Sequence, residues 1–247
     1  MTIRIVLCSI VLLLSELRNI SCACLTKRCK NDKIHIVNKT ITRSGEDAMI
    51  KNVIFDFGQV LVHFDPDYMC SRHIKNPDDL RLVSDVLFDR LYWDKLDAGT
   101  ISDEEVVRSA LTRLPEKLHS AAEKIYYGWI HTLPEMEGMR DVIGLCRQKN
   151  LKIYLLSNIS TSFAENYKEI PIIDGFDGYV FSSTAGCVKP SHDIFRHICD
   201  KFSLNPSESL FVDDNIKNID GARSFGIIPY HFDSDASKLR EYISSLN

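Results

Sequence analysis

The chain has 247 residues, which is long enough for one large domain or for a core that carries a smaller insertion. Its apolar and charged fractions, 45% and 26%, are those of an ordinary soluble protein and predict a sizeable buried core. The formal net charge of −4, without a Lys/Arg-rich run, excludes a basic face for nucleic acid and favours a small, soluble partner.

The first 48 residues have two alternative interpretations. Arg4 and the apolar run 5–14 have the composition of an export signal, and residues 21–23 offer a cleavage site, but the run is too short to span a bilayer. The polar remainder has no sustained period and ends where the folded pattern begins, so we favour a translation start at Met49. This start predicts a cytoplasmic protein, whereas a genuine signal predicts export. Under both interpretations, residues 1–48 form an N-terminal extension that does not carry the function.

Five short runs rich in apolar and β-branched residues follow Met49: 52–56, 152–157, 178–182, 209–213 and 226–230. The first, second and fourth runs are almost continuously apolar, as expected for parallel strands that are covered on both faces. Helical patterns separate most of the runs, which is typical of βαβ units. The sequence therefore predicts an α/β protein with a doubly wound parallel sheet.

The stretch between the first two strands is far longer than a single crossover needs. Four of its residues keep helical spacing: Leu80, Val83, Leu87 and Leu91. A capping box begins a further helix at Ser102, and Pro115 and Pro134 mark other helix starts. We expect an inserted α-helical cap at residues 65–136, and a core made of residues 49–64 and 137–247.

Three of the predicted strands end in a polar side chain, namely Asp56, Ser157 and Asp213. A single aspartate in that place often only opens a turn or caps a helix. In an open parallel sheet, however, ligands bind at the carboxyl ends of the strands. The three residues, taken with Lys189, therefore favour a phosphate-handling site.

These residues occur in an order that resembles the haloacid dehalogenase-like hydrolase superfamily, in the subfamily with a cap inserted after the first motif. The four matching motifs are Asp56 in VIFDFGQVLV (53–62), Ser157 in LLSN (155–158), Lys189 in VKP (188–190), and Asp213-Asp214 in FVDDN (211–215). Each motif is weak alone, but four in order at the family's spacing are specific. The resemblance covers residues 49–247 and implies a Rossmann-like core and a phosphatase activity.

The resemblance implies that Asp56 attacks phosphorus and forms an aspartyl-phosphate intermediate. Because carboxylate and phosphate repel each other, a cation is needed between them, and Mg²⁺ is the expected cofactor. Asp56 and Asp213 are its expected ligands, together with the carbonyl oxygen of Gly58 and with Asp214, which is expected to act through a bound water. Ser157 and Asn158 are expected to donate hydrogen bonds to the phosphoryl oxygens, and Lys189 to stabilise the charge on the transferring group.

Gly58 is a departure from the family pattern. Phosphatases of this superfamily usually carry a second aspartate at that position, which protonates the leaving oxygen and then activates water. The absence of this aspartate removes general acid–base catalysis, which contributes roughly 10²–10⁴-fold to the reaction rate. It argues against a phosphomutase. It also predicts that the rate of the first step depends steeply on the pKa of the leaving group. His63 and Asp65 could replace the missing acid, although such residues after a first strand are more often solvated.

The sequences 56–62 and 213–222 resemble the branch of the superfamily that includes α-glucose-1-phosphate phosphatases. Members of this branch share the glycine at this position. A sugar phosphate such as glucose-1-phosphate is therefore the expected substrate, because an anomeric oxygen leaves more readily than an ordinary alcohol. A metal-independent dehalogenase and a non-catalytic phosphate-binding or regulatory protein remain alternatives, but the Asp213-Asp214 pair favours a metal-dependent phosphatase. Four aromatic residues in the cap are expected to pack in its interior instead of forming a sugar platform: Trp93, Tyr126, Tyr127 and Trp129.

Overall fold

The computed structural model describes residues 49–246. The choice between a start at Met49 and an export signal concerns residues outside this part of the chain and stays a prediction. In the described part, no helix has both the length and the apolar character needed to cross a membrane.

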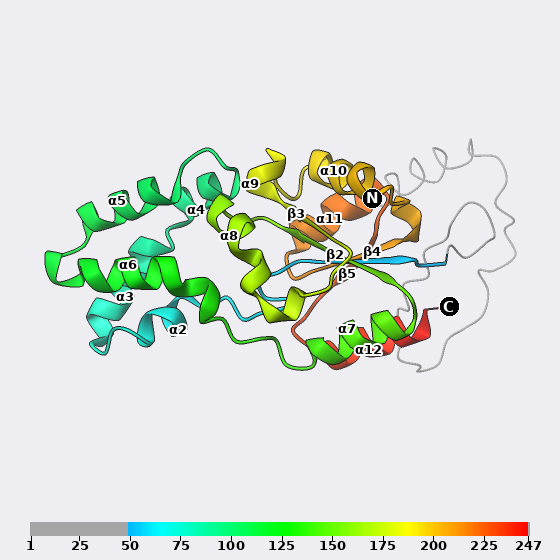
Figure 1. Ribbon diagram of the computed structural model, residues 1–247, viewed down its shortest axis with the longest axis horizontal. Helices are drawn as coiled ribbons and strands as arrows, with labels where there is room; N and C mark the ends of the chain where they lie inside the picture. Colours follow the sequence, from blue (N-terminus) through cyan, green and yellow to red (C-terminus); the bar gives the residue numbers. More distant parts are fainter. Residues whose placement is uncertain (1–48, 247) are drawn as a thin grey trace, which may run out of the picture. The chain divides into compact units, whose positions relative to one another are not determined.

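A five-stranded parallel sheet forms the centre of the fold, with strand order β3-β2-β1-β4-β5 (Figure 1). Its strands are β1 (Asn52–Phe55), β2 (Lys152–Ser157), β3 (Gly178–Phe181), β4 (Ser209–Asp213) and β5 (Ile228–His231). The predicted doubly wound sheet is thus confirmed. Only the last strand differs noticeably from its predicted range, because Gly226 (φ 103°) ends the preceding helix with a left-handed residue and the strand starts two residues later.

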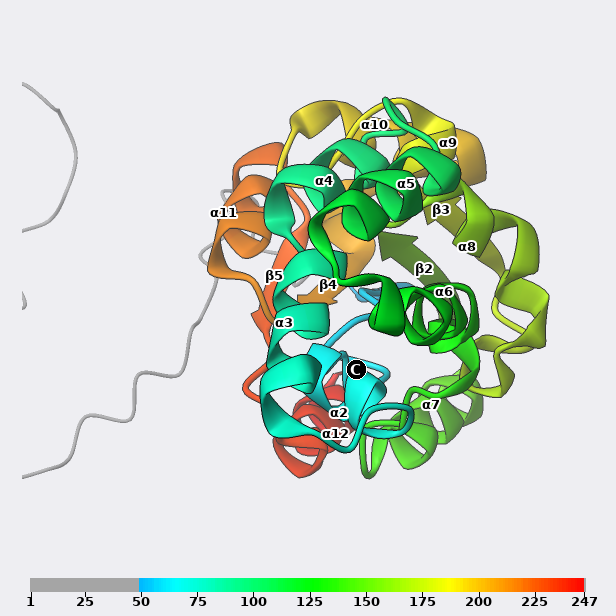
Figure 2. The same ribbon diagram turned by 90° about the vertical axis from the view of Figure 1, so that its left-hand side faces the viewer.

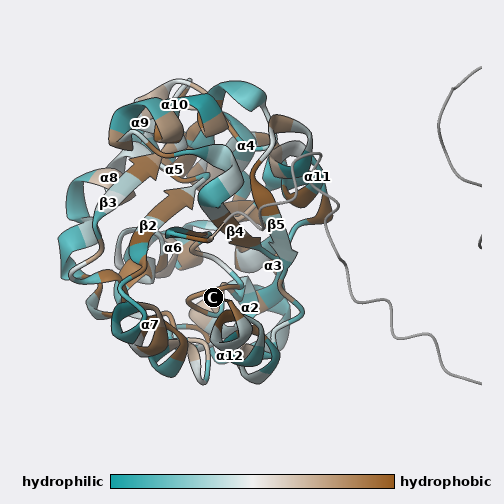
Figure 3. Cartoon of the chain, turned by 90° about the vertical axis from the view of Figure 1, so that its right-hand side faces the viewer, coloured by the Kyte–Doolittle hydropathy of each residue, from teal (hydrophilic) through white to brown (hydrophobic). Residues whose placement is uncertain are grey.

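Alternate residues of each strand supply two separate hydrophobic cores. Val53 and Phe55 of β1 point to one face of the sheet, and Ile54 points to the other. Helices α7 and α12 cover the first face, and α10 and α11 cover the second (Figures 1 and 3). Strands β2 and β4 are coloured mostly as hydrophobic, whereas the edge strand β5 is coloured largely as hydrophilic (Figure 3). Burial on both faces explains why the strand sequences are almost continuously apolar.

The helices of the core are α7 (Met139–Gln148), α8 (Thr161–Asn166), α9 (Ser182–Ala185), α10 (His192–Phe202), α11 (Ile216–Phe225) and α12 (Ala236–Ser245). Short 3₁₀ helices join some of the elements: η1 (Glu116–Leu118), η2 (Trp129–His131), η3 (Tyr167–Glu169), η4 (Pro171–Ile173) and η5 (Pro206–Glu208).

Between β1 and β2 the chain forms an inserted helical cap, as the sequence predicts. Its helices are α2 (Pro66–Ser71), α3 (Pro77–Leu87), α4 (Arg90–Asp97), α5 (Asp103–Arg113) and α6 (His119–Gly128), and Figure 2 shows them from the side of the cap. The predicted capping box starts α5: Glu105 N–H donates to Ser102 Oγ over 3.2 Å, and Ser102 N–H donates to Glu105 Oε2 over 2.9 Å.

Two details of the predicted cap were wrong. Leu91 does not continue the helix of Leu87, because Asp89 caps a new helix there and leaves Leu91 exposed. Pro134 does not start a helix. Instead, the residues from Pro134 to Met136 run beside the segment that follows β1, with His63 N–H bonded to Pro134 O and Met136 N–H bonded to Leu61 O. The two connections between cap and core therefore lie side by side.

The large aromatic side chains of the cap pack against one another. Trp93 contacts Phe64 and Trp129 with ring centroids 5.5 and 5.8 Å away, and its indole N–H donates to Leu87 O. Both tryptophans are buried. Together with Tyr126, which is also buried, they form the interior of the cap as expected from the sequence. Tyr127 is 54% exposed, so the expectation of interior packing was wrong for this residue.

Candidate active site

The polar residues at the strand ends meet at the carboxyl edge of the sheet. Asp56 directly follows β1, Ser157 ends β2, and Asp213 ends β4. Because β1 pairs with β2 on one side and with β4 on the other, the three residues lie on adjacent strands. The strand order reverses between β1 and β4, which is the place where open α/β sheets bind their ligands.

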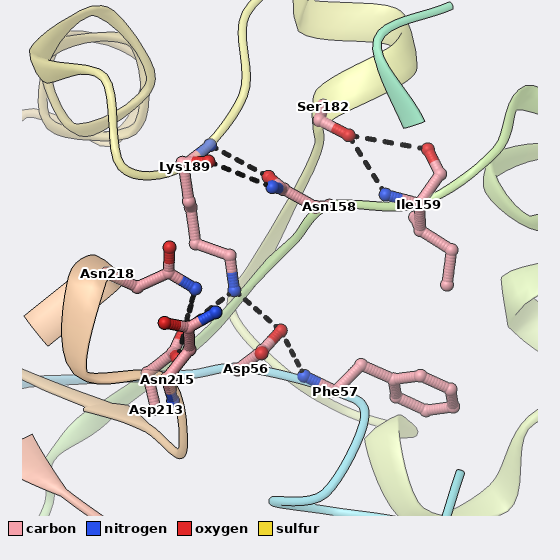
Figure 4. Close-up of polar contacts among 9 residues, drawn as sticks. All are labelled: Asp56, Phe57, Asn158, Ile159, Ser182, Lys189, Asp213, Asn215 and Asn218. Carbon is pink, nitrogen blue, oxygen red and sulfur yellow. Dashed lines mark hydrogen bonds and ion pairs between the residues drawn. The ribbon is translucent and has the colours of Figure 1, made fainter. Parts of the chain in front are cut away.

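Lys189 brings this group together from the loop that precedes α10. Its ammonium nitrogen lies 2.7 Å from Asp56 Oδ1 and 2.8 Å from Asp213 Oδ2 (Figure 4). The Lys189 side chain is 1% exposed and that of Asp213 is fully buried. A buried charge is stable only when it is paired, and Lys189 is paired on two sides.

The side-chain amide of Asn158 holds the backbone of Lys189. Asn158 Oδ1 accepts the Lys189 N–H over 2.8 Å, and Asn158 Nδ2 donates to the Lys189 carbonyl oxygen over 3.1 Å (Figure 4). Asn158 thus positions the lysine in this structure. Its predicted role as a ligand of the substrate stays a prediction.

Asp213 is fixed by two asparagines that the sequence analysis did not identify. The Asn215 N–H donates to Asp213 Oδ1 over 2.8 Å, and Asn218 Nδ2 lies 3.1 Å from each Asp213 oxygen. Asn218 is buried on the face of α11 that also buries Ile219 and Ala222. A polar residue on this apolar face, just after the acidic pair, was the signal that could have revealed it.

The environment changes the proton affinities of the site. Burial raises the pKa of Asp56 above its ordinary value, the Lys189 ammonium opposes this rise, and the charge of Asp213 adds to it. Burial lowers the pKa of Lys189, but the carboxylates of Asp213 and Asp56 outweigh that effect and raise it overall. The lysine is therefore held in its charged form between the two carboxylates.

A cluster of three carboxylates at this edge can hold a divalent cation. One ligand atom from each of Asp56, Asp213 and Asp214 lies within 4.8 Å of the others. Burial, followed by the charge of Asp213, raises the pKa of Asp214. Three carboxylates and a single ammonium leave an excess of negative charge, and hard oxygen atoms are the ligands that Mg²⁺ prefers. The residues thus fit a magnesium ion.

Gly58 lies in the turn after Asp56, where an added side chain would find room. A Cβ atom there would meet only Phe64 Cβ, at the ordinary contact distance of 3.7 Å. The two sequence-based candidates for the missing acid are both exposed. His63 is exposed, and Asp65 is an exposed helix cap whose Oδ1 accepts the Tyr68 N–H at the start of α2.

The chain resembles known proteins over most of the described residues. A family model for haloacid dehalogenase-like hydrolases matches residues 35–226. A D-ribitol-5-phosphate phosphatase from Bacteroides thetaiotaomicron is 28% identical over 215 residues, which cover 81% of this chain and 100% of the relative. A sesquiterpene phosphatase from Aspergillus oryzae is 23% identical over 185 residues, covering 73% of this chain and 89% of the relative.

A similar fold occurs in a solved structure of a HAD family enzyme from Bacteroides thetaiotaomicron, in complex with magnesium and inorganic phosphate. It has a TM-score of 0.56 and 21% sequence identity, and the match covers 77% of this chain and 98% of the other. At this identity the likeness concerns the fold alone.

Proposed function

Because the chain belongs to the haloacid dehalogenase-like hydrolase family, we propose that it is a Mg²⁺-dependent phosphatase that hydrolyses phosphate monoesters of small polar metabolites through an aspartyl-phosphate on Asp56. The observation that supports this proposal most is the buried Lys189 ammonium between the carboxylates of Asp56 and Asp213. An ammonium held beside a strand-end carboxylate suits the transfer of a negatively charged phosphoryl group.

Asp56 is oriented for nucleophilic attack. Both the Phe57 N–H, at 2.7 Å, and the Lys189 ammonium bind its Oδ1 atom. This fixes the carboxylate and leaves Oδ2, for which the described residues provide no hydrogen-bond donor, as the atom that attacks phosphorus. The attack splits hydrolysis into two displacements, and water cleaves the acyl-phosphate in the second.

The groups around Asp56 stabilise the transferring phosphoryl group. Ser157 is buried at the end of β2, where its hydroxyl can donate to a phosphoryl oxygen. Lys189 provides a fixed positive charge that needs no reorganisation during the reaction. Asp56, Asp213, Asp214 and the Gly58 carbonyl oxygen would hold Mg²⁺, which supplies positive charge against the repulsion between carboxylate and phosphate.

The substrate we propose is a sugar or polyol phosphate, a class that includes glucose-1-phosphate. The relative named D-ribitol-5-phosphate phosphatase matches along its entire length and supports a polyhydroxylated substrate. The two cap tryptophans do not support a terpenyl phosphate, because Trp93 and Trp129 are buried against each other and neither is available to a hydrocarbon substrate.

A panel of phosphomonoesters, assayed with the purified chain with and without Mg²⁺, tests this function. We expect Mg²⁺-dependent release of phosphate from p-nitrophenyl phosphate and from at least one sugar or polyol phosphate. Binding of phosphate esters without any turnover would instead support the non-catalytic alternative. Metal-independent release of halide from a haloacid would support a dehalogenase.

Replacement of Asp213 by asparagine is expected to raise the Mg²⁺ concentration that gives half-maximal activity by at least about tenfold, because a charged ligand becomes a neutral one. A Mg²⁺ titration of p-nitrophenyl phosphate hydrolysis measures the shift. Asp220→Asn is the matched control, since Asp220 lies on α11 in an exposed ion pair with Arg223. Normal activity of Asp213→Asn in EDTA would contradict the assignment of the metal site.

A further inference from the structure

The C-terminal end of α4 connects the cap to the strand ends of the core. Ser182 Oγ donates to the Asp97 carbonyl oxygen over 2.5 Å and accepts the Ile159 N–H over 2.9 Å. Figure 4 shows Ser182 beside Ile159, which follows Asn158, the residue that holds Lys189. The backbone of Asp97 is therefore connected to the backbone of Lys189 through the Ser182 hydroxyl and the adjacent residues Ile159 and Asn158.

A glycine makes this close contact possible. Gly99, two residues after Asp97, has φ +67°, and a Cβ atom there would lie 2.6 Å from the Ser183 carbonyl oxygen. No larger residue fits between the end of α4 and the start of α9 without moving the backbone. The fold thus brings α4 against the core at this point more closely than ordinary packing allows.

Two buried polar atoms at this junction have no hydrogen-bond partner among the described residues. They are Asp97 Oδ1 and Ser183 Oγ. A buried donor or acceptor without a partner destabilises the fold, so native proteins rarely retain one unless it serves a ligand or a reaction. Within residues 49–246, the Asp97 carboxyl group is part of neither an ion pair nor a helix cap, which distinguishes it from Asp65.

The charges around Asp97 suit it to proton transfer. Burial raises the pKa of Asp97 to about 7, Arg90 and Lys189 lower it, and Asp94 raises it. Arg90 and Asp94 belong to its own helix, whereas Lys189 belongs to the core and is the same ammonium that binds Asp56. An acid with a pKa near neutral pH is the most effective proton donor there.

We propose that Asp97 is the general acid and base of this enzyme, supplying from the cap the proton transfer that Gly58 cannot perform. In the first step an Asp56 oxygen bonds to phosphorus, the ester P–O bond breaks, and the Asp97 proton passes to the leaving oxygen. In the second step Asp97 accepts a proton from the water that attacks phosphorus, and the bond to Asp56 breaks to release phosphate. The inference rests on the proposed function.

This assignment widens the substrate class. With an acid in place, the alkoxide of an ordinary alcohol can leave as the neutral alcohol. Phosphates of primary alcohols then become substrates, as well as those with a good leaving group such as an anomeric oxygen. Polyol phosphates esterified at a primary hydroxyl belong to this class.

The test compares Asp97→Asn with the wild type on a series of substituted aryl phosphates and on a primary alkyl phosphate. We expect kcat/KM of the variant to fall by about 10²–10⁴-fold for the alkyl phosphate and by less than about tenfold for p-nitrophenyl phosphate, which needs no acid. For the wild type acting on the alkyl phosphate, kcat should fall as pH rises above about 7, because the acid loses its proton. That alkaline decrease should be absent from the variant.

Three comparisons make the result decisive. Asp85→Asn, an exposed position on α3, is the matched control and should behave as the wild type. The melting temperature of Asp97→Asn should not be lower than that of the wild type, because the replaced oxygen has no partner to lose. Gly58→Asp in the Asp97→Asn background should restore part of the alkyl phosphatase activity, since position 58 has room for a side chain.

An equal loss for all leaving groups, or a change in KM alone, would overturn the acid role of Asp97. These outcomes leave the proposed function intact as long as the wild type hydrolyses p-nitrophenyl phosphate and the activity depends on Asp56. If the wild type fails to hydrolyse any phosphate ester, the function itself is wrong.

Discussion

Asp56→Asn is expected to reduce kcat for p-nitrophenyl phosphate by about 10⁴-fold or more, since it replaces the nucleophile with an amide that cannot attack phosphorus. The fold should persist, because Lys189 keeps its second ion pair, with Asp213 at 2.8 Å. Steady-state kinetics measure the loss, and circular dichroism confirms that the variant is folded. Mass spectrometry of the variant excludes deamidation back to aspartate.

The same replacement should also remove the covalent intermediate. Acid-quenched wild-type enzyme is expected to carry a phosphoryl group on the peptide that contains Asp56, and Asp56→Asn should carry none. Asp85→Asn serves as the control for an aspartate exposed on the cap. Substantial turnover by verified Asp56→Asn protein, or a phosphoryl group on another residue, would remove Asp56 from the nucleophilic role.

Much of the core could be predicted because each strand is specified by residues that are close together in the sequence. Each strand is a short apolar run, and the polar residue that ends it must lie at the carboxyl edge of a parallel sheet. This rule places Asp56, Ser157 and Asp213 at one edge of the sheet, whereas their position on adjacent strands follows from the strand order. The two-residue shift of β5 has an equally local cause, since Gly226 can serve as a helix C-cap as readily as a strand start.

The remaining parts of the candidate site depend on contacts between residues far apart in the sequence. Asn158 was predicted to bind phosphate because of its motif, but its bonds to Lys189, 31 residues away, are visible only in the folded chain. Asp97 is more remote still, because its environment arises where the inserted cap meets α9, 85 residues further along the chain. Spacing along the sequence carries no signal for such a contact.

Lys189→Ala is the second change expected to have a large effect, and it should lower both activity and stability. The substitution leaves the carboxylates of Asp56 and Asp213 close together without their shared cation, and Asp213 is fully buried. Removing one partner of a buried ion pair costs about 3–5 kcal/mol of unfolding free energy. Loss of the charge that stabilises the phosphoryl group should reduce kcat by about 10²–10³-fold.

The loss of stability should depend on pH in a defined direction. Without the ammonium, which opposes the rise, burial and the charge of Asp213 hold the pKa of Asp56 in the folded state still further above its unfolded value. The folded variant then binds more protons than the unfolded chain, so its stability falls as pH rises through this window. Compared with the wild type, Lys189→Ala should be least stable at about pH 8 and should recover part of the difference near pH 5.

Urea denaturation of both proteins in EDTA, at the two pH values, measures the effect without a contribution from bound metal. Lys217→Ala is the matched control, because Lys217 is exposed on α11 and forms no ion pair among the described residues. If Lys189→Ala were as stable as the control at both pH values, the two carboxylates would not need their cation for stability. The lysine would then have to act through the reaction alone, and the kcat of the same variant would show whether it does.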